Sequence, residues 1–269
     1  MVSAGISTGG RSELARLTRG GRRLVTVEDA ASALELDRSS AAKKLARWTQ
    51  EGWLRRVRRG LYIPVPVDAP NPRTWTEDPR VLADAAWSPC YFTGWTAANH
   101  WALTEQVFTT TVVKTSARVR HSKQTLADAP FLVTHVAPQQ LEWGLATVWH
   151  QEIRLRYADE ARTVIDILDD PRLGGGVRHV AEILDAYLVG NDPEKLIDYG
   201  DRLDNGTVFK RLGLLVERLG LEATALVEAC KARLTSGVTS LDPGGPAGGS
   251  VDSAWGLRVN VSIGPGDVG

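Results

Sequence analysis

The sequence predicts an α+β protein, with a small N-terminal helical domain that ends in a β-hairpin and a larger mixed α+β domain behind it. Three observations predict this class. Apolar residues recur at helical spacing between residues 12 and 51. Two short strand-like runs follow, at 53–57 and 61–64. Farther along the chain, strand-like segments come first and helical ones after, which favours α+β over a doubly wound sheet.

Composition places the domain boundary at a proline-rich segment. Residues 64–72 read PVPVDAPNP, with four prolines, which is typical of a semi-rigid linker. The predicted domains are an N-terminal domain over residues 1–67 with a flexible start at 1–10, a linker at 68–75, and a C-terminal α+β domain over 76–269.

Three helices are expected in the N-terminal domain. The first spans about residues 12–20, where Gly20 and Gly21 would end it. Thr26 is the expected N-cap of the second, and Asp29 stands three residues later, where its carboxylate can complete a capping box. Asp37 is placed to cap a third helix that runs to about Glu51.

The third helix has two distinct faces. Ala41, Leu45 and Trp48 share one apolar side at helical spacing. Polar and basic residues occupy the other. Behind this helix, two strands joined at Gly60 complete the order of a winged helix-turn-helix.

Charge is distributed unevenly along a chain that is neutral as a whole. Residues 1–67 contain 13 Lys/Arg and 6 Asp/Glu, a net charge of +7, so the remaining 19 basic and 26 acidic residues give 68–269 a net charge of −7. Such segregation suggests that the basic part meets a polyanion and that the acidic part stays away from it.

The basic helix followed by a basic hairpin therefore predicts a DNA-binding surface. A helix fits the major groove of B-DNA, and a hairpin tip suits the minor groove or the backbone. With six to eight phosphate contacts, log K would fall against log salt with a slope of about −5 to −7. The basic residues also have explanations that involve no DNA. Those of the helix can simply form a solvated surface, and those of the hairpin can protect a strand edge against aggregation. RNA or protein could also bind such a module. The candidate DNA-binding residues are Arg38, Ser39, Ser40, Lys43, Lys44, Arg47, Arg55, Arg56, Arg58 and Arg59.

The C-terminal domain is predicted to mix strands and helices. A helix is expected to begin at Asp78-Pro79 and end near Ala86, because proline is tolerated in the first turn. Strands are expected at 91–93, 108–114, 131–137, 146–149, 153–156 and 256–263, and helices at 96–103, 161–168, 180–187, 208–219 and 221–234.

No sequence pattern of a common catalytic site is present, and we expect neither a cofactor nor a metal site. The two cysteines, Cys90 and Cys230, are too few for a disulfide framework, so a reduced, cytoplasmic protein is the simplest interpretation. The acidic residues between Asp159 and Asp170 leave open an alternative, a metal-dependent nuclease. However, Asp166 follows Arg162 by four residues, as in an ordinary helical ion pair.

Several segments resemble the AbiEi family, the antitoxin and autorepressor component of bacterial type IV toxin–antitoxin systems, in its actinobacterial form. The hairpin GWLRRVRRGLY is similar to the wing of that family. In the C-terminal domain the chain departs from the family pattern at two positions: Trp101 stands where the family often has Gly, and Ala161 stands where it has Glu. The other similar segments are Asp78-Pro79 to Thr93, the helix 96–100, ARTVID at 161–166, KRLGLL at 210–215, Leu241-Asp242-Pro243, and 255–260.

The resemblance implies a division of labour. The N-terminal domain would bind inverted repeats of double-stranded DNA in the promoter of its own operon. The C-terminal domain would neutralise a nucleotidyltransferase-like toxin, and the protein would have no enzymatic activity of its own. Besides the nuclease, a repressor that responds to a small ligand in its C-terminal domain remains an alternative.

Overall fold

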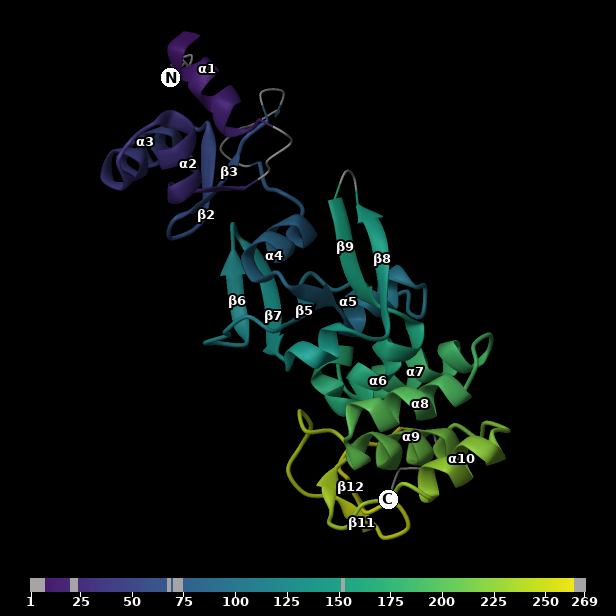
Figure 1. Ribbon diagram of the computed structural model, residues 1–269. Helices are drawn as coiled ribbons and strands as arrows, with labels where there is room; N and C mark the ends of the chain where they lie inside the picture. Colours follow the sequence, from purple (N-terminus) through teal and green to yellow (C-terminus); the bar gives the residue numbers. More distant parts are fainter. Residues whose placement is uncertain (1–7, 20–23, 67–68, 70–74, 151–152, 264–269) are drawn as a thin grey trace. The chain divides into compact units, whose positions relative to one another are not determined.

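The computed structural model describes residues 8–19, 24–66, 69, 75–150 and 153–263 (Figure 1). The chain divides into two compact units. The first comprises residues 1–86 together with 125–130, and the second comprises 87–124 and 131–269. The first unit therefore runs past residue 67, where the sequence places the domain boundary. Within the described residues, no helix is long and apolar enough to cross a membrane.

Parts of three sequence predictions lie outside the described residues. They are the flexible start over residues 1–7, the helix end at Gly20-Gly21, and the proline-rich linker except for residues 69 and 75.

The first unit combines helices with a small sheet. Strands β1 and β2 both pair antiparallel with β3, in the order β1-β3-β2, and a bulge in β2 lies between Arg56 and Arg58. Its elements are α1 (Thr8–Leu17), β1 (Val25–Thr26), α2 (Val27–Leu34), α3 (Arg38–Gln50), β2 (Leu54–Arg58), β3 (Leu61–Pro64) and α4 (Pro79–Trp87), the last residue of which belongs to the second unit.

Both predicted helix caps are confirmed. The Thr26 hydroxyl accepts from the Asp29 backbone N–H at 3.0 Å, and the Asp29 carboxylate accepts from the Thr26 N–H at 2.9 Å, which makes a complete capping box. Asp37 accepts from the N–H groups of Ser39 and Ser40 at 2.9 and 3.0 Å. These bonds satisfy amide groups that have no partner inside the helix.

The apolar face predicted for α3 is the buried one. Ala41, Leu45 and Trp48 are at most 1% exposed and pack with Val25, Leu54 and other residues of one core. Burial of this face fixes the rotation of α3, so the polar face of the helix must point outward.

A six-stranded mixed sheet forms the base of the second unit, apart from residues 125–126 of its strand β6 and 129–130 of β7, which belong to the first. The strand order of this sheet is β6-β7-β5-β4-β9-β8, with β5/β7 and β4/β9 parallel and β4/β5 and β8/β9 antiparallel. Strand β6 is an addition to the strands predicted from sequence. The strands are β4 (Cys90–Phe92), β5 (Thr111–Thr115), β6 (Lys123–Leu126), β7 (Ala129–His135), β8 (Leu145–His150) and β9 (Ile153–Ala158).

Helices gather beside this sheet and bury the larger core (Figure 1). A three-stranded sheet near the C-terminus, in the order β10-β12-β11, packs on the far side of the helices. Helix α8 was not predicted. The remaining elements are α5 (Gly94–His100), η1 (Pro138–Leu141), α6 (Glu160–Asp169), η2 (Pro171–Gly174), α7 (Val177–Leu188), α8 (Glu194–Leu203), α9 (Gly206–Arg218), α10 (Thr224–Lys231), β10 (Thr239–Ser240), β11 (Ser250–Asp252) and β12 (Leu257–Val259).

The segments that carry the family resemblance in the second unit hold its core together. Arg211 of α9 donates to the carbonyl oxygens of Leu168, Asp169, Ser240 and Leu241, so one guanidinium ties the end of α6 to the C-terminal segment. Burial lowers the pKa of Arg211, although nearby carboxylates oppose the shift. These strings are therefore explained by packing and hydrogen bonding inside the unit.

Candidate nucleic-acid interface

The start of α3 is positioned by Asp37. Hydrogen bonds from Ser40, and then from the Ser39 backbone, lower the pKa of Asp37. Its carboxylate is therefore charged at neutral pH and occupies the first N–H groups of the helix. Ser39 and Ser40 are exposed, but their N–H groups are already used, and the Ser40 hydroxyl also bonds to Asp37. The Ser39 hydroxyl is therefore the group that this pair offers to a ligand.

Three basic residues of α3 face solvent. The Arg38 side chain is 80% exposed and pairs with Glu28 at 2.9 Å, and the Arg47 side chain is 62% exposed and lies 3.5 Å from Glu51. Lys43 is exposed, and no ion pair to it is found among the described residues. Exposed ion pairs contribute little free energy, so Arg38 and Arg47 can exchange their partners for phosphate.

Lys44 differs from its neighbour Lys43. Its ammonium pairs with Glu13 of α1 and lies 5.6 Å from the centre of the Trp48 ring, and its side chain is only 18% exposed. This lysine joins α3 to α1. Helical spacing predicts that Lys44 lies on the exposed face of α3. It could not show the pairing with Glu13, which lies 31 residues earlier in the chain.

The four arginines of the hairpin separate in a similar way. Arg55 is 19% exposed and donates to the Trp75 carbonyl and to the Asp128 carboxylate, both within the first unit. Arg56, Arg58 and Arg59 are exposed, because Arg56 and Arg58 lie on either side of the buried Val57 in β2 and Arg59 lies in the turn. Arg58 also donates to the Ala86 carbonyl at 3.2 Å.

The turn that carries Arg59 depends on a glycine. Gly60 has φ of +80°, a conformation that L-residues rarely adopt, and it closes the hairpin between β2 and β3. No atom lies within 4 Å of where a side chain would begin at Gly60, so this end of the hairpin is open.

The structure thus sorts the candidate residues into two groups. Lys44 and Arg55 are bound to other parts of the first unit. The residues available to a ligand are Arg38, Ser39, Ser40, Lys43, Arg47, Arg56, Arg58 and Arg59.

The carboxylate needed for the nuclease alternative is inaccessible. Asp166 is 0% exposed, and its oxygens accept four hydrogen bonds, which uses all the acceptor positions of a carboxylate. The donors are Lys114 at 2.9 Å, Arg162 at 3.0 Å, Thr93 at 2.7 Å and Tyr91 at 3.1 Å. In the described part of the chain, no group of three or more His, Cys, Asp or Glu residues could hold a metal ion.

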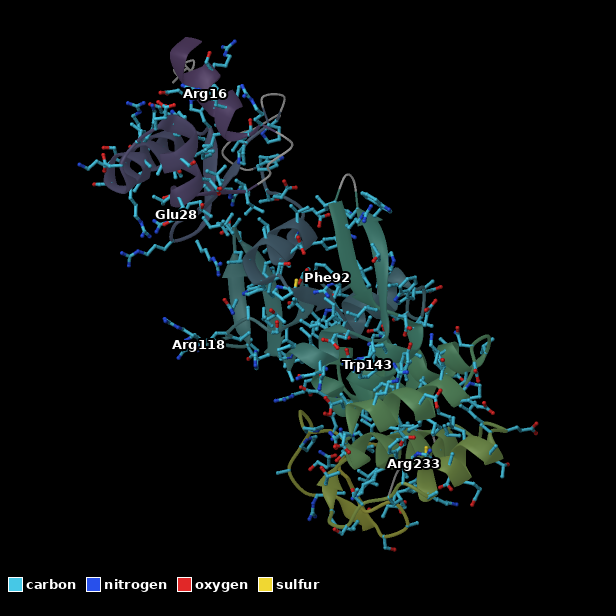
Figure 2. All side chains as sticks on the ribbon, viewed as in Figure 1. Arg16, Glu28, Phe92, Arg118, Trp143 and Arg233 are labelled. Atoms are coloured by element: carbon cyan, nitrogen blue, oxygen red, sulfur yellow. The ribbon has the colours of Figure 1, made fainter. Side chains whose placement is uncertain are left out.

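The charges around Asp166 also govern its protonation. Burial alone would raise the pKa of Asp166, but the positive charges of Lys114 and Arg162 and the hydrogen bonds from Thr93 and Lys114 hold it below its usual value. The Arg162 guanidinium lies 3.5 Å from the centre of the Trp143 ring, so the charge cluster is enclosed (Figure 2). An ionised, saturated carboxylate of this kind is a structural group.

One basic segment was missed in the sequence, because the charge of residues 68–269 was summed as a single part. Arg118, Arg120 and Lys123 are exposed in the segment between β5 and β6, within a part of the chain whose net charge is negative. The signal was the string RVRHSK at 118–123, which the average over the C-terminal domain obscured.

Comparison with known proteins agrees with this picture. Among solved structures, the chain is similar to the RV2827C protein from Mycobacterium tuberculosis, with a TM-score of 0.67 and 17% identity, over 94% of this chain and 92% of that one. At this identity, the likeness concerns the fold alone. No curated protein matches the chain. Residues 12–65, which carry α3 and the β2–β3 hairpin, match the family described as "Transcriptional regulator, AbiEi antitoxin". This match confirms, for residues 12–65, the resemblance to the AbiEi regulators seen in the sequence.

Proposed function

We propose that the protein is a DNA-binding autorepressor that reads operator repeats upstream of its own operon with α3 and the β2–β3 hairpin. The observation that carries the proposal is the exposed basic face of α3 beside an arginine-bearing hairpin, within the segment that matches a transcriptional regulator family. Helices α2 and α3 followed by this hairpin have the order of a winged helix-turn-helix.

The two elements would play different parts on DNA. Ser39, Ser40 and Lys43 lie in the first half of α3, the part of a recognition helix that meets base edges in the major groove. Lys43 can donate to guanine, whereas the hydroxyls can bind phosphates or bases. Arg59 at the hairpin end would contact phosphates or the minor groove, which supplies affinity more than sequence specificity.

A fluorescence anisotropy titration against the upstream region of its own operon tests this proposal. We expect the double variant Lys43→Ala/Arg59→Ala to bind at least about tenfold more weakly, because a good base contact alone is worth about 1–3 kcal/mol. Arg202→Ala removes an exposed cation from α8 as a matched control and should leave the affinity unchanged. Equal affinity of wild type and the double variant would refute the proposed interface.

We further infer an antitoxin role, directed at a nucleotidyltransferase-like toxin encoded nearby. The support is the family description of the segment at 12–65. The neighbouring reading frame is the first observation to make. Co-expression with the product of that frame should then restore growth, and the Lys43→Ala/Arg59→Ala variant should restore it equally if antagonism resides in the second unit. Absence of any growth rescue by the wild type contradicts the antitoxin role and leaves the repressor role intact.

A further inference from the structure

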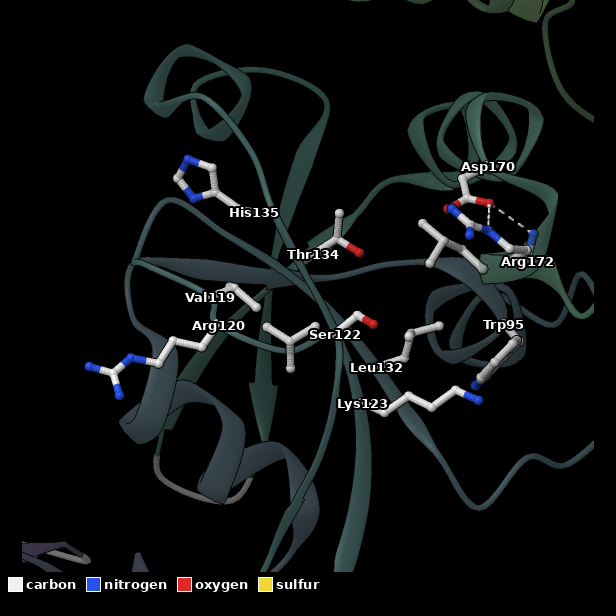
Figure 3. A pocket seen from close by; sticks show the side chains of 12 residues that line it. Trp95, Val119, Arg120, Ser122, Lys123, Leu132, Thr134, His135, Asp170 and Arg172 are labelled. Atoms are coloured by element: carbon white, nitrogen blue, oxygen red, sulfur yellow. Dashed lines mark hydrogen bonds and ion pairs between the residues drawn. The ribbon is translucent and has the colours of Figure 1, made fainter. Parts of the chain in front are cut away.

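A cavity of about 600 Å³ opens in the second unit, beside the basic segment at 118–123 (Figure 3). It lies between β7, the segment that leads into β6, Trp95 of α5 and the short helix η2. All of its lining residues belong to the second unit. A volume of this size lies within the range of small-molecule and cofactor sites.

One part of the cavity wall is aromatic and rigid. The Trp95 ring stacks on Phe108, with 4.6 Å between the ring centres and 14° between the planes. Its indole N–H donates to the Thr110 carbonyl at 2.6 Å, which fixes the orientation of the ring. Phe108 does not line the cavity, so Trp95 presents to it a surface that Phe108 leaves uncovered. Leu132 and Leu173 extend this apolar wall.

The other part of the lining is basic. Lys123 and Arg120 are exposed, and none of the acidic side chains that the structure describes forms an ion pair with either. Arg172 donates to both oxygens of Asp170, at 2.8 and 2.9 Å, so this pair is internally neutral. Three cations and one carboxylate line the cavity, which leaves a net charge of 3 − 1 = +2.

Hydrogen-bonding groups lie between these two parts. Ser122 and Thr134 line the cavity with their hydroxyls. Figure 3 shows Lys123 directed toward Trp95 and the Arg120 guanidinium directed away from both, so Lys123 is the cation placed for a ligand that stacks on Trp95. A ligand that satisfies the whole lining must combine a flat ring with a separate multiply charged anion. Phosphate alone would leave the apolar wall unused, and an apolar molecule would leave Lys123 unpaired.

We propose that this cavity binds a nucleotide, with the base against Trp95 and the phosphates at Lys123. Bases stack on aromatic side chains whatever their identity, and lysine and arginine are the usual partners of phosphate. The site is separate from α3 and the hairpin, so nucleotide binding does not depend on the proposed DNA-binding function. If the two are coupled, the nucleotide would be the small effector of a ligand-responsive repressor.

Isothermal titration of the full-length protein without DNA tests this site, with ATP, GTP, CTP, UTP and sodium tripolyphosphate as separate titrants. Lys123→Glu reverses one charge at the cavity. Arg118→Glu is the matched control, because Arg118 is exposed in the same segment and is not among the lining residues (Figure 2). Both positions are exposed, so both variants should fold, and their melting temperatures verify this.

We expect at least one nucleotide to bind, Lys123→Glu to weaken it by at least about tenfold, and Arg118→Glu to change it by less than about threefold. Tripolyphosphate should bind more weakly than that nucleotide, because it cannot stack on Trp95. No binding of any nucleotide at millimolar concentration would overturn the proposal. An equal loss of nucleotide affinity in the two variants would show that a diffuse basic surface, and not the cavity, binds the nucleotide. An affinity for tripolyphosphate equal to that for the nucleotide would show that the base is not recognised. Either result also overturns the assignment.

Discussion

At the scale of single residues, the same side-chain type serves opposite purposes depending on partners far away in sequence. Lys43 and Lys44 are neighbours on α3, yet the first is open to a ligand and the second is paired with Glu13. Arg55 and Arg56 differ in the same way, because Arg55 reaches Asp128, 73 residues later. Helical spacing predicted which residues lie outside the core. It could not predict these pairings, which depend on tertiary contacts.

Asp166 offers a direct test of the buried charge cluster. Asp166→Asn keeps the size of the side chain but removes the charge partner of Arg162 and leaves Lys114 only the more distant Asp169 carboxylate, at 3.9 Å. Breaking a buried ion pair by removing one partner costs about 3–5 kcal/mol, so we expect a loss of that order in the free energy of unfolding at pH 7. Urea unfolding measures it. Asp185→Asn, at an exposed position of α7, is the control and should change stability little. A loss as small as that of the control would contradict the role of the cluster.

The same carboxylate predicts a pH dependence. The pKa of Asp166 is lowered in the folded protein, so its contribution to stability is present above the pKa of the unfolded chain and is lost as pH falls through the folded value. Stability measured from pH 7 downward should therefore fall more steeply in the wild type than in Asp166→Asn. Parallel curves would show that the folded and unfolded pKa values of Asp166 are alike.

The thiols are expected to be inert in the folded state. Burial raises the pKa of Cys230 to about 12, against a small opposing effect of Arg233, so almost none of it is thiolate at neutral pH. Cys90 is buried as well. A chromogenic disulfide reagent at pH 8 should report no fast-reacting thiol in the native protein and two in guanidinium chloride. A fast-reacting thiol in the native state would show that one of these side chains becomes accessible.

At the scale of elements, the close packing of the C-terminal segment on α9 requires a glycine in the helix. Gly213 lies in the middle of α9, and a Cβ there would stand 2.0 Å from the Trp255 ring, which is 1% exposed. Alanine normally stabilises a helix interior relative to glycine by about 0.5–1 kcal/mol. Here we expect Gly213→Ala to destabilise the protein instead, because Trp255 must leave its site.

The control is Gly9→Ala in α1, where no atom lies within 4 Å of the added Cβ. It should be neutral or stabilising. Thermal unfolding followed by tryptophan fluorescence compares the two variants. An increase in melting temperature for Gly213→Ala would show that Trp255 does not pack closely on α9.

Elements with strong local signals were predictable, and elements defined by tertiary contacts were not. The caps at Thr26 and Asp37 are local and were found from sequence. Helix α8 was missed although Leu196, Gly200 and Leu203 stand at helical spacing, because only the first two are fully buried and Gly200, which packs on Phe209, does not register as an apolar side chain. Strand β6 is short and mostly polar, and its place is set by pairing with β7. The cavity could not be predicted, since it joins residues from four separate segments.

At the scale of the whole molecule, neutrality hides a basic first quarter and an acidic remainder, and salt dependence is the measurement that separates them. The structure leaves six accessible cations on α3 and the hairpin, since Lys44 and Arg55 are paired internally. If all six neutralise phosphates, log K against log salt has a slope of about −5 per bound copy, at the shallow end of the range that the sequence allows.

The expected slope can be dissected with variants. Lys43→Ala/Arg59→Ala should make it shallower by about 2, one for each positive charge removed from the DNA interface, whereas Lys44→Ala should leave it nearly unchanged because Lys44 is paired with Glu13. Lys123→Glu should also leave the slope unchanged if the cavity is a nucleotide site separate from the operator interface. A slope that responds to Lys123→Glu as strongly as to Lys43→Ala would instead place the basic segment at 118–123 on the DNA, and the electrostatic division of the chain at residue 67 would then be wrong.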